Sequence, residues 1–205
     1  MGQEHVRRRP GGRTARNREK ILRATLDILL TSGYDDLSIS RVAARADVAE
    51  TTVYRNWPTK THLAAEALAE LASTENPIPD TGSLEGDLRA LLTQVVHLID
   101  RPAVRRVVRA VVALDTEEPE IASLKSTFWS ERFAAARSIV ERAIGRGELS
   151  PGADADAIIE DLASVAYFRL LITGRPLDAQ LIERSVAVVM RLHHRDPAQQ
   201  PSGAS

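Results

Sequence analysis

The sequence predicts an all-α protein of about nine helices, and three observations support this fold class. Apolar residues recur every three to four positions over most of the chain, which is the period of an amphipathic helix. Proline, glycine and helix-capping residues interrupt this pattern where helices are expected to begin and end. The alternation of apolar and polar residues between hairpin turns, which is typical of β-strands, is absent from the sequence.

The first 62 residues are expected to form a basic arm and a domain of three helices, residues 14–62. Residues 1–13 contain arginine, proline and glycine but no apolar period, so we expect them to be disordered. Gly33 favours the end of the first helix, Ser38 offers an N-cap for the second, and Pro58 closes the third. The expected helices span residues 14–32, 39–46 and 50–57.

The remaining chain is expected to form a larger helical domain, residues 63–195, followed by a disordered tail, residues 196–205. Thr59 caps the first of these helices, and Pro102 and Pro119 mark later breaks. The helices expected here span residues 60–75, 84–99, 103–114, 120–144, 154–173 and 178–193.

The charges are divided unevenly along the chain. Residues 1–62 hold 12 basic and 7 acidic residues, a net charge of +5, whereas the rest of the chain holds 15 and 21, a net charge of -6. A basic module joined to an acidic domain is typical of a nucleic-acid-binding protein. The alternative is a basic disordered tail, and charge alone does not decide between the two.

Composition also excludes several classes of protein. The chain has no cysteine, so it has no disulfide, thiolate metal site or cysteine nucleophile. No segment approaches the roughly 20 apolar residues that span a bilayer, and the basic N-terminal residues run into Pro10 and Gly11 instead of an apolar signal core. We therefore expect a cytoplasmic protein that is neither secreted nor embedded in a membrane.

Two of the short helices, residues 39–46 and 50–57, form a candidate helix-turn-helix joined by the tight turn at residues 47–49. The run from Leu37 to Lys60 closely resembles the motif of the TetR family. The match includes Gly33-Tyr34, Ile39, Val42-Ala43, Thr52-Val53-Tyr54 and the aromatic-Pro-hydroxyl-Lys run from Trp57 to Lys60.

This resemblance implies a homodimeric transcriptional regulator, usually a repressor, that grips double-stranded operator DNA. In a helix-turn-helix the second helix presents its N-terminal residues to base edges, while flanking residues hold phosphates. Thr51, Thr52 and Arg55 would face DNA. The resemblance places Tyr54 and Trp57 against the DNA backbone, and the alternative for each ring is an aromatic plug in the core. The full predicted DNA-binding set is Ser38, Arg45, Glu50, Thr51, Thr52, Tyr54, Arg55, Trp57 and Lys60.

The chain departs from the family motif in the turn. Asp47 stands where the family usually has glycine, and Ala49 where it often has a serine cap. Aspartate tolerates a left-handed backbone better than most residues, so we expect the turn to persist. Loss of the cap is expected to cost about 1 kcal/mol, and Glu50 should point toward a base edge or solvent because phosphate would repel it.

In the family, the last two helices pair with their mates across a two-fold axis as a four-helix bundle. Their apolar positions here form the predicted dimer interface, although a monomer could use some of them as core. These positions are Ile158, Ile159, Leu162, Val165, Leu181, Ile182, Val188, Val189 and Leu192.

An unknown small-molecule effector is expected to bind among the middle helices of this domain, again by family resemblance. The candidate pocket residues are His97, Phe128, Trp129, Phe133, Tyr167 and Arg169. Side chains of these types at this spacing are more often ordinary core or surface than ligand contacts, and the sequence does not specify the chemistry of the ligand.

Three alternatives remain at this point. The histidines show no metal-site spacing, and nucleophile-elbow, Walker and dinucleotide motifs are absent; we therefore expect no metal, no cofactor and no enzyme, and a measured turnover without DNA binding would favour the opposite. A regulator without a ligand, in which the second domain only dimerises or binds another protein, would show a solidly packed core. The arginine arm either reaches DNA or adds only nonspecific affinity.

Overall fold

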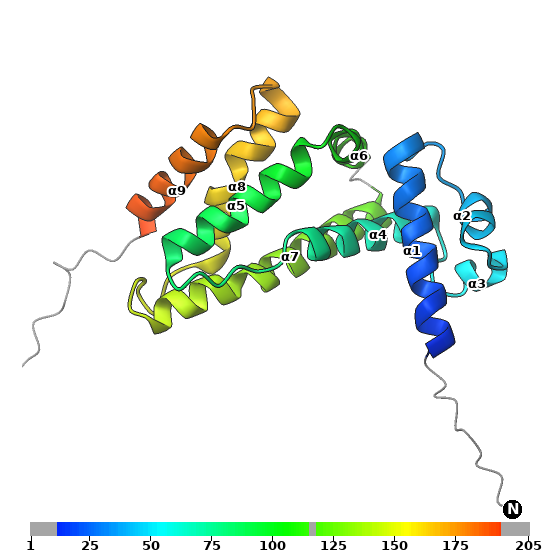
Figure 1. The fold of residues 1–205 in the computed structure, drawn as a ribbon, viewed down its shortest axis with the longest axis horizontal. Helices are drawn as coiled ribbons and strands as arrows, with labels where there is room; N and C mark the ends of the chain where they lie inside the picture. Colours follow the sequence, from blue (N-terminus) through cyan, green and yellow to red (C-terminus); the bar gives the residue numbers. More distant parts are fainter. Residues whose placement is uncertain (1–11, 115–117, 194–205) are drawn as a thin grey trace, which may run out of the picture. The chain divides into compact units, whose positions relative to one another are not determined.

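The computed structural model describes residues 12–114 and 118–193 (Figure 1). Within these ranges the chain forms nine α-helices and one short π-helical segment, without a strand, so the all-α prediction is confirmed. The predicted arm and tail fall largely outside the described residues, although the first helix already begins at Gly12. The elements are α1 Gly12–Ser32, α2 Ile39–Ala46, α3 Glu50–Tyr54, α4 Lys60–Glu75, α5 Leu84–Asp100, α6 Pro102–Ala113, α7 Pro119–Gly145, α8 Ala155–Phe168, η1 Arg169–Thr173 and α9 Ala179–His193.

The chain divides into two compact units, Met1–Leu71 and Ala72–Ser205. The division therefore falls inside α4, nine residues after the boundary between residues 62 and 63 that the sequence predicts. No helix in the described ranges is both long enough and apolar enough to cross a membrane.

In the first unit, α1 packs against α2, and α2 against α3. The apolar stripe of α1 is buried as its period predicts, with Ile21, Ile28 and Leu29 at most 1% exposed. Gly33 ends this helix with a φ of 92°, a conformation that glycine adopts without steric cost. Its amide donates to the carbonyl oxygens of Ile28 and Leu29, which closes the last turn.

The core of the second unit lies between α5, α7, α8 and α9, where side chains such as Leu88, Ile139 and Ile158 are fully buried. The carboxylate of Asp87 is buried among them, and it accepts hydrogen bonds from the amide and hydroxyl of Thr81 at 2.6 and 2.8 Å. It also lies 3.5 Å from a guanidinium nitrogen of Arg142 on α7. The buried charge is thus compensated by donors that tie the start of α5 to α7.

Two helices end earlier than their sequence pattern predicts. The helix expected to reach residue 57 stops at Tyr54, and turns join its end to α4. The helix expected over residues 154–173 changes at Phe168 into the π-helical η1, which Gly174 ends with a φ of 65°. The guanidinium of Arg109 on α6 donates to the carbonyl oxygen of Leu170 inside η1 at 3.1 Å.

Candidate nucleic-acid interface

The turn between α2 and α3 has the geometry that the helix-turn-helix prediction requires. Asp47 adopts the left-handed conformation, with φ 55° and ψ 54°, which agrees with its expected tolerance of this turn. The amide of Val48 donates to the carbonyl oxygen of Ala43 at 3.1 Å, which closes α2. Ala49 provides no side-chain cap to α3, as the sequence predicts.

The five-residue α3 is anchored by one side and exposed on the other. Val53 is fully buried against the unit's core, whereas Thr51, Tyr54 and Arg55 are exposed and Thr52 is half-buried. Tyr54 leaves 52% of its surface open, a high value for an aromatic residue. The exposed side of α3 and its C-cap residue Arg55 therefore offer hydroxyl, aromatic and guanidinium groups, which are groups that contact bases and phosphates.

The predicted DNA-binding residues near α3 differ in the hydrogen bonds and ion pairs that their side chains form within the protein. The Ser38 hydroxyl caps α2 by accepting a hydrogen bond from the amide of Arg41 at 3.2 Å, which leaves its own proton available to a phosphate. The exposed Arg45 forms an ion pair with Asp27 of α1. Glu50 is exposed at the first turn of α3.

Lys60 begins α4 and its ammonium lies over the ring of Tyr34, with Nζ 4.6 Å from the ring centroid. The hydroxyl of Tyr34 is 3.0 Å from the hydroxyl oxygen of Thr61. The ring face attracts the ammonium itself, whose N–H groups can still take an additional anionic partner.

Trp57 differs from the other predicted DNA-binding residues because it is 2% exposed. Its indole Nε1 donates to Oε2 of Glu66 at 2.5 Å, and the other oxygen of that carboxylate pairs with Arg18 of α1. Sequence reasoning missed Glu66 and Arg18, since the link joins residues 48 positions apart.

Four of the predicted pocket residues do come together in the second unit. Trp129 on α7 makes edge-on contacts with Phe128 and with Tyr167 of α8, at centroid distances of 5.2 and 5.3 Å, and contacts Phe133 at 6.3 Å. Burial raises the pKa of Tyr167 to about 12. Burial also lowers the pKa of the neighbouring Arg132, whose guanidinium donates to the carbonyl oxygen of Asn76.

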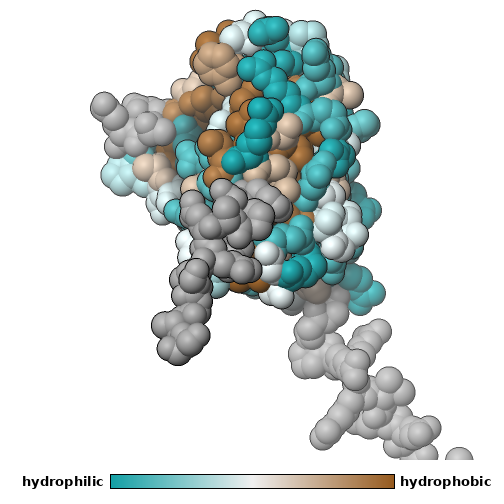
Figure 2. All heavy atoms as spheres, turned by 90° about the vertical axis from the view of Figure 1, so that its left-hand side faces the viewer, coloured by the Kyte–Doolittle hydropathy of each residue, from teal (hydrophilic) through white to brown (hydrophobic). Residues whose placement is uncertain are grey.

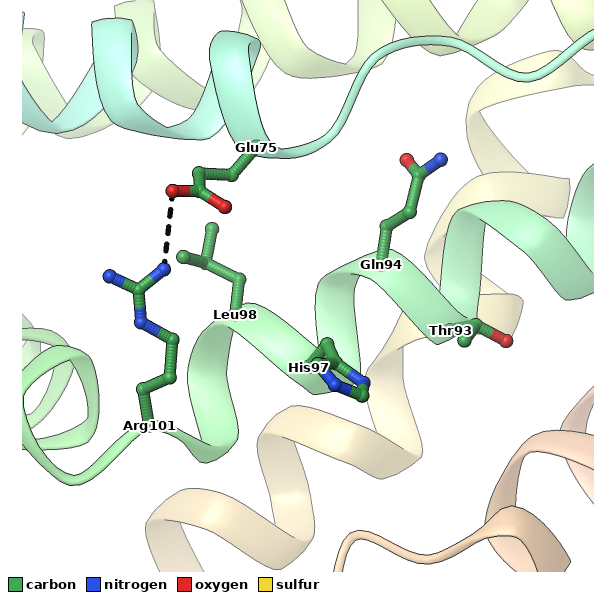
Figure 3. Close-up of a pocket in the computed structure, with 6 residues that line it drawn as sticks. All are labelled: Glu75, Thr93, Gln94, His97, Leu98 and Arg101. Carbon is green, nitrogen blue, oxygen red and sulfur yellow. Dashed lines mark ion pairs between the residues drawn. The ribbon is translucent and has the colours of Figure 1, made fainter.

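The other two predicted pocket residues lie apart from this aromatic cluster. His97 lines a cavity of about 280 Å³ between the end of α4 and α5 (Figure 3). An ion pair of 3.3 Å between Glu75 and Arg101 crosses one side of it, and the amide oxygen of Gln94 is buried there without a hydrogen-bond partner. Arg169 instead donates to the carbonyl oxygen of Pro176 at 2.6 Å. In the described ranges no group of three or more metal-ligating side chains is found.

The predicted dimer residues separate into two groups. Ile158, Ile159, Leu162, Leu181 and Val189 are buried in the core of the single chain, and Ile182 is partly buried. Val165, Val188 and Leu192 are 42–65% exposed, and Phe168 and Ile172, which sequence reasoning missed, are 55% and 72% exposed. We call the five residues of this second group the exposed apolar set. Figure 2 shows hydrophobic residues at the surface between hydrophilic ones on the face that it draws.

Comparison with known proteins identifies both parts of the chain. A family model described as bacterial regulatory proteins, tetR family, matches residues 21–67. A second model, described as tetracyclin repressor-like, C-terminal domain, matches residues 78–189. Together the two matches cover the helix-turn-helix and the core of the second unit.

Relatives of similar length are found along almost the whole chain. The HTH-type transcriptional regulator AqdR of Rhodococcus erythropolis is 30% identical over 91% of this chain and 90% of its own length. The DNA-binding transcriptional repressor TetR of Mycobacteroides abscessus is 31% identical over 83% of this chain and 90% of its own. The crystal structure of the TetR family transcription regulator SCO0332 has a TM-score of 0.78, with 27% identity over 85% of this chain and 97% of that chain.

Proposed function

Because the chain belongs to the TetR family of DNA-binding transcriptional regulators, we propose that it binds a two-fold symmetric operator as a homodimeric repressor and that a small molecule releases it. The observation that carries operator binding is the exposed side of α3 and its C-cap, where Thr51, Tyr54 and Arg55 are open to solvent and Val53 is the buried anchor. The family and its relatives are regulators and not enzymes.

Operator binding is tested by gel shift with the purified protein and the DNA that flanks its own gene, across a salt series, with random DNA as the control. Specific retention that weakens with salt, together with two-fold symmetric protection, supports the proposal. If neither this DNA nor a genome-wide operator selection yields a specific site, operator binding is refuted.

Repression is proposed because the similar protein of Mycobacteroides abscessus is named a repressor. A reporter gene that carries the operator across its promoter gives the sign of regulation. Expression that falls when the protein is co-expressed supports repression, whereas expression that rises would make the protein an activator.

The exposed apolar set supports the dimer, because single chains rarely leave several large apolar side chains open to water on neighbouring helices. Val165, Phe168 and Ile172 follow one another on α8 and η1, and Val188 and Leu192 lie one turn apart on α9. The two helices contact each other within the chain. A two-fold dimer is what binding to two half-sites about 34–36 Å apart requires.

The proposed ligand site is the cavity at His97, since it combines a buried, unpartnered acceptor on Gln94 with the ion pair of Glu75 and Arg101. Glu75 is the last residue of α4, and the first is Lys60, which we propose contacts a DNA phosphate. A ligand that separates Glu75 from Arg101 would therefore act on the helix that carries Lys60.

A thermal-shift screen of small molecules, followed by operator titration with each ligand that binds, tests this part of the proposal. A ligand that lowers operator affinity for the wild type but not for Gln94→Ala supports it. Equal operator affinity with and without every bound ligand would favour the alternative, a regulator controlled by a partner protein.

A further inference from the structure

We propose that Glu66 is a positioning residue for operator binding: its carboxylate on α4 holds Trp57, and through it the orientation of α3, relative to α1. The inference rests on the proposed operator binding and adds a residue that is remote from the DNA-facing side chains. Three segments of the first unit meet at this one carboxylate, namely α1 through Arg18, the end of α3 through Trp57, and α4 through Glu66 itself.

Trp57 is joined rigidly to the end of α3. Its backbone amide donates to the carbonyl oxygen of Val53 at 2.9 Å, so the turn after α3 continues the helix's own hydrogen bonds. Val53 is fully buried and the Trp57 ring is 2% exposed. An α3 of only five residues has little hydrogen bonding of its own to fix its direction, so these two buried side chains set that direction.

Glu66 fixes the Trp57 ring by a hydrogen bond to a charged acceptor. Nε1 of Trp57 is 2.5 Å from Oε2 of Glu66, and hydrogen bonds to an ionised carboxylate are about twice as strong as neutral ones. The second oxygen, Oε1, pairs with the guanidinium of Arg18, which favours the orientation in which Oε2 faces the indole. The indole is thus held at both its apolar body and its polar edge.

The charge of Glu66 and its proposed positioning role predict opposite effects of its removal on DNA binding. A negative charge in a DNA-binding unit repels phosphates, so removing it should tighten binding slightly. A positioning role predicts that removing it weakens binding, and the sign of the effect therefore separates the two.

The experiment compares full-length Glu66→Ala with Glu19→Ala, which removes the same charge from the same unit. Glu19 is an exposed residue of α1 that pairs with Arg23 one turn away in the same helix. The probe is the operator found for the wild type, with random DNA beside it, and the temperature is one at which circular dichroism shows every variant folded. We expect Glu66→Ala to raise the operator Kd about tenfold and to leave the Kd for random DNA within about twofold. Glu19→Ala should leave both unchanged or slightly lower.

A second readout reports the indole directly, because the chain contains only two tryptophans. In a nitrogen–proton NMR spectrum Trp57→Phe assigns the two indole signals, and the Trp57 indole proton should exchange slowly in the wild type and faster in Glu66→Ala. Glu66→Gln keeps an acceptor for the indole without the charge, so it should restore slow exchange and most of the operator affinity.

These outcomes separate the two proposals. If the wild type does not bind an operator, the proposed function fails. If the wild type binds and folded Glu66→Ala binds the operator equally well, or loses operator and random DNA in the same proportion, the positioning role of Glu66 is overturned.

Discussion

Replacing Lys60 by glutamine should weaken binding to every DNA sequence and make binding less sensitive to salt. The ammonium of Lys60 is held over the ring of Tyr34 at 4.6 Å, and the Tyr34 hydroxyl lies 3.0 Å from that of Thr61 in the same first turn of α4. Because the side chain is already ordered in the free protein, it loses less conformational entropy when it binds a phosphate. The contact of Lys60 with a phosphate should therefore have one preferred geometry.

The magnitude follows from counterion release. Each phosphate neutralised contributes about 0.9 to the slope of log K against log salt, so loss of Lys60 from both chains of a dimer should make the slope shallower by about 1.8. Between 50 and 200 mM salt, the wild type should therefore lose roughly twelve times more affinity than the variant.

The assay is fluorescence anisotropy of labelled operator at four or more salt concentrations. Arg23→Gln is the matched control, since it removes one positive charge from the same unit and breaks only an exposed ion pair within α1. Its slope should equal that of the wild type. An unchanged slope for folded Lys60→Gln, beside a salt-dependent wild type, would refute the assignment of Lys60 to a phosphate.

Three further outcomes are expected. Arg55→Ala should relax the preference at one base position of each half-site by about 1–3 kcal/mol, measured by selection from randomised operators; an unaltered preference would remove Arg55 from base recognition. Val188→Asp, at a residue 42% exposed, should shift sedimentation toward monomer, and Ala187→Asp, on a different side of α9, should not; a persistent dimer would exclude this surface. Burial raises the pKa of Tyr167 to about 12, so the folded chain keeps a proton that the unfolded chain loses near about 10. Stability should therefore fall as pH rises from 10 to 12, and a wild-type curve identical to that of Tyr167→Phe would contradict this.

The helices could be predicted because their signals are local. The apolar period of α1, the serine that caps α2 and the left-handed Asp47 each act within a few residues. The predicted end of the helix over residues 154–173 was wrong, because the chain changes to the π-helical η1 at Arg169; inside η1 the carbonyl oxygen of Leu170 accepts a hydrogen bond from Arg109 of α6.

The candidate site was predicted in part. A resemblance places Thr51, Tyr54 and Arg55 on one helix, and their exposure is compatible with a role at DNA. For the second unit, the spacing of apolar residues could not distinguish Ile158, which is buried in the chain's own core, from Val165, which is exposed. Both satisfy the same helical period, and only the packing of neighbouring helices tells core from surface.

The sequence by itself determined the fold class, the family and the position of the helix-turn-helix, because periodicity, caps and an ordered motif are properties of short stretches of chain. Only the tertiary structure decided which side chains meet across those stretches. It joined Glu66 to Trp57 and Arg18, brought Tyr167 of α8 against Trp129 of α7, and left His97 beside a separate cavity. Such contacts depend on the relative placement of helices, which arises from the packing of the whole core and is not encoded by any single segment.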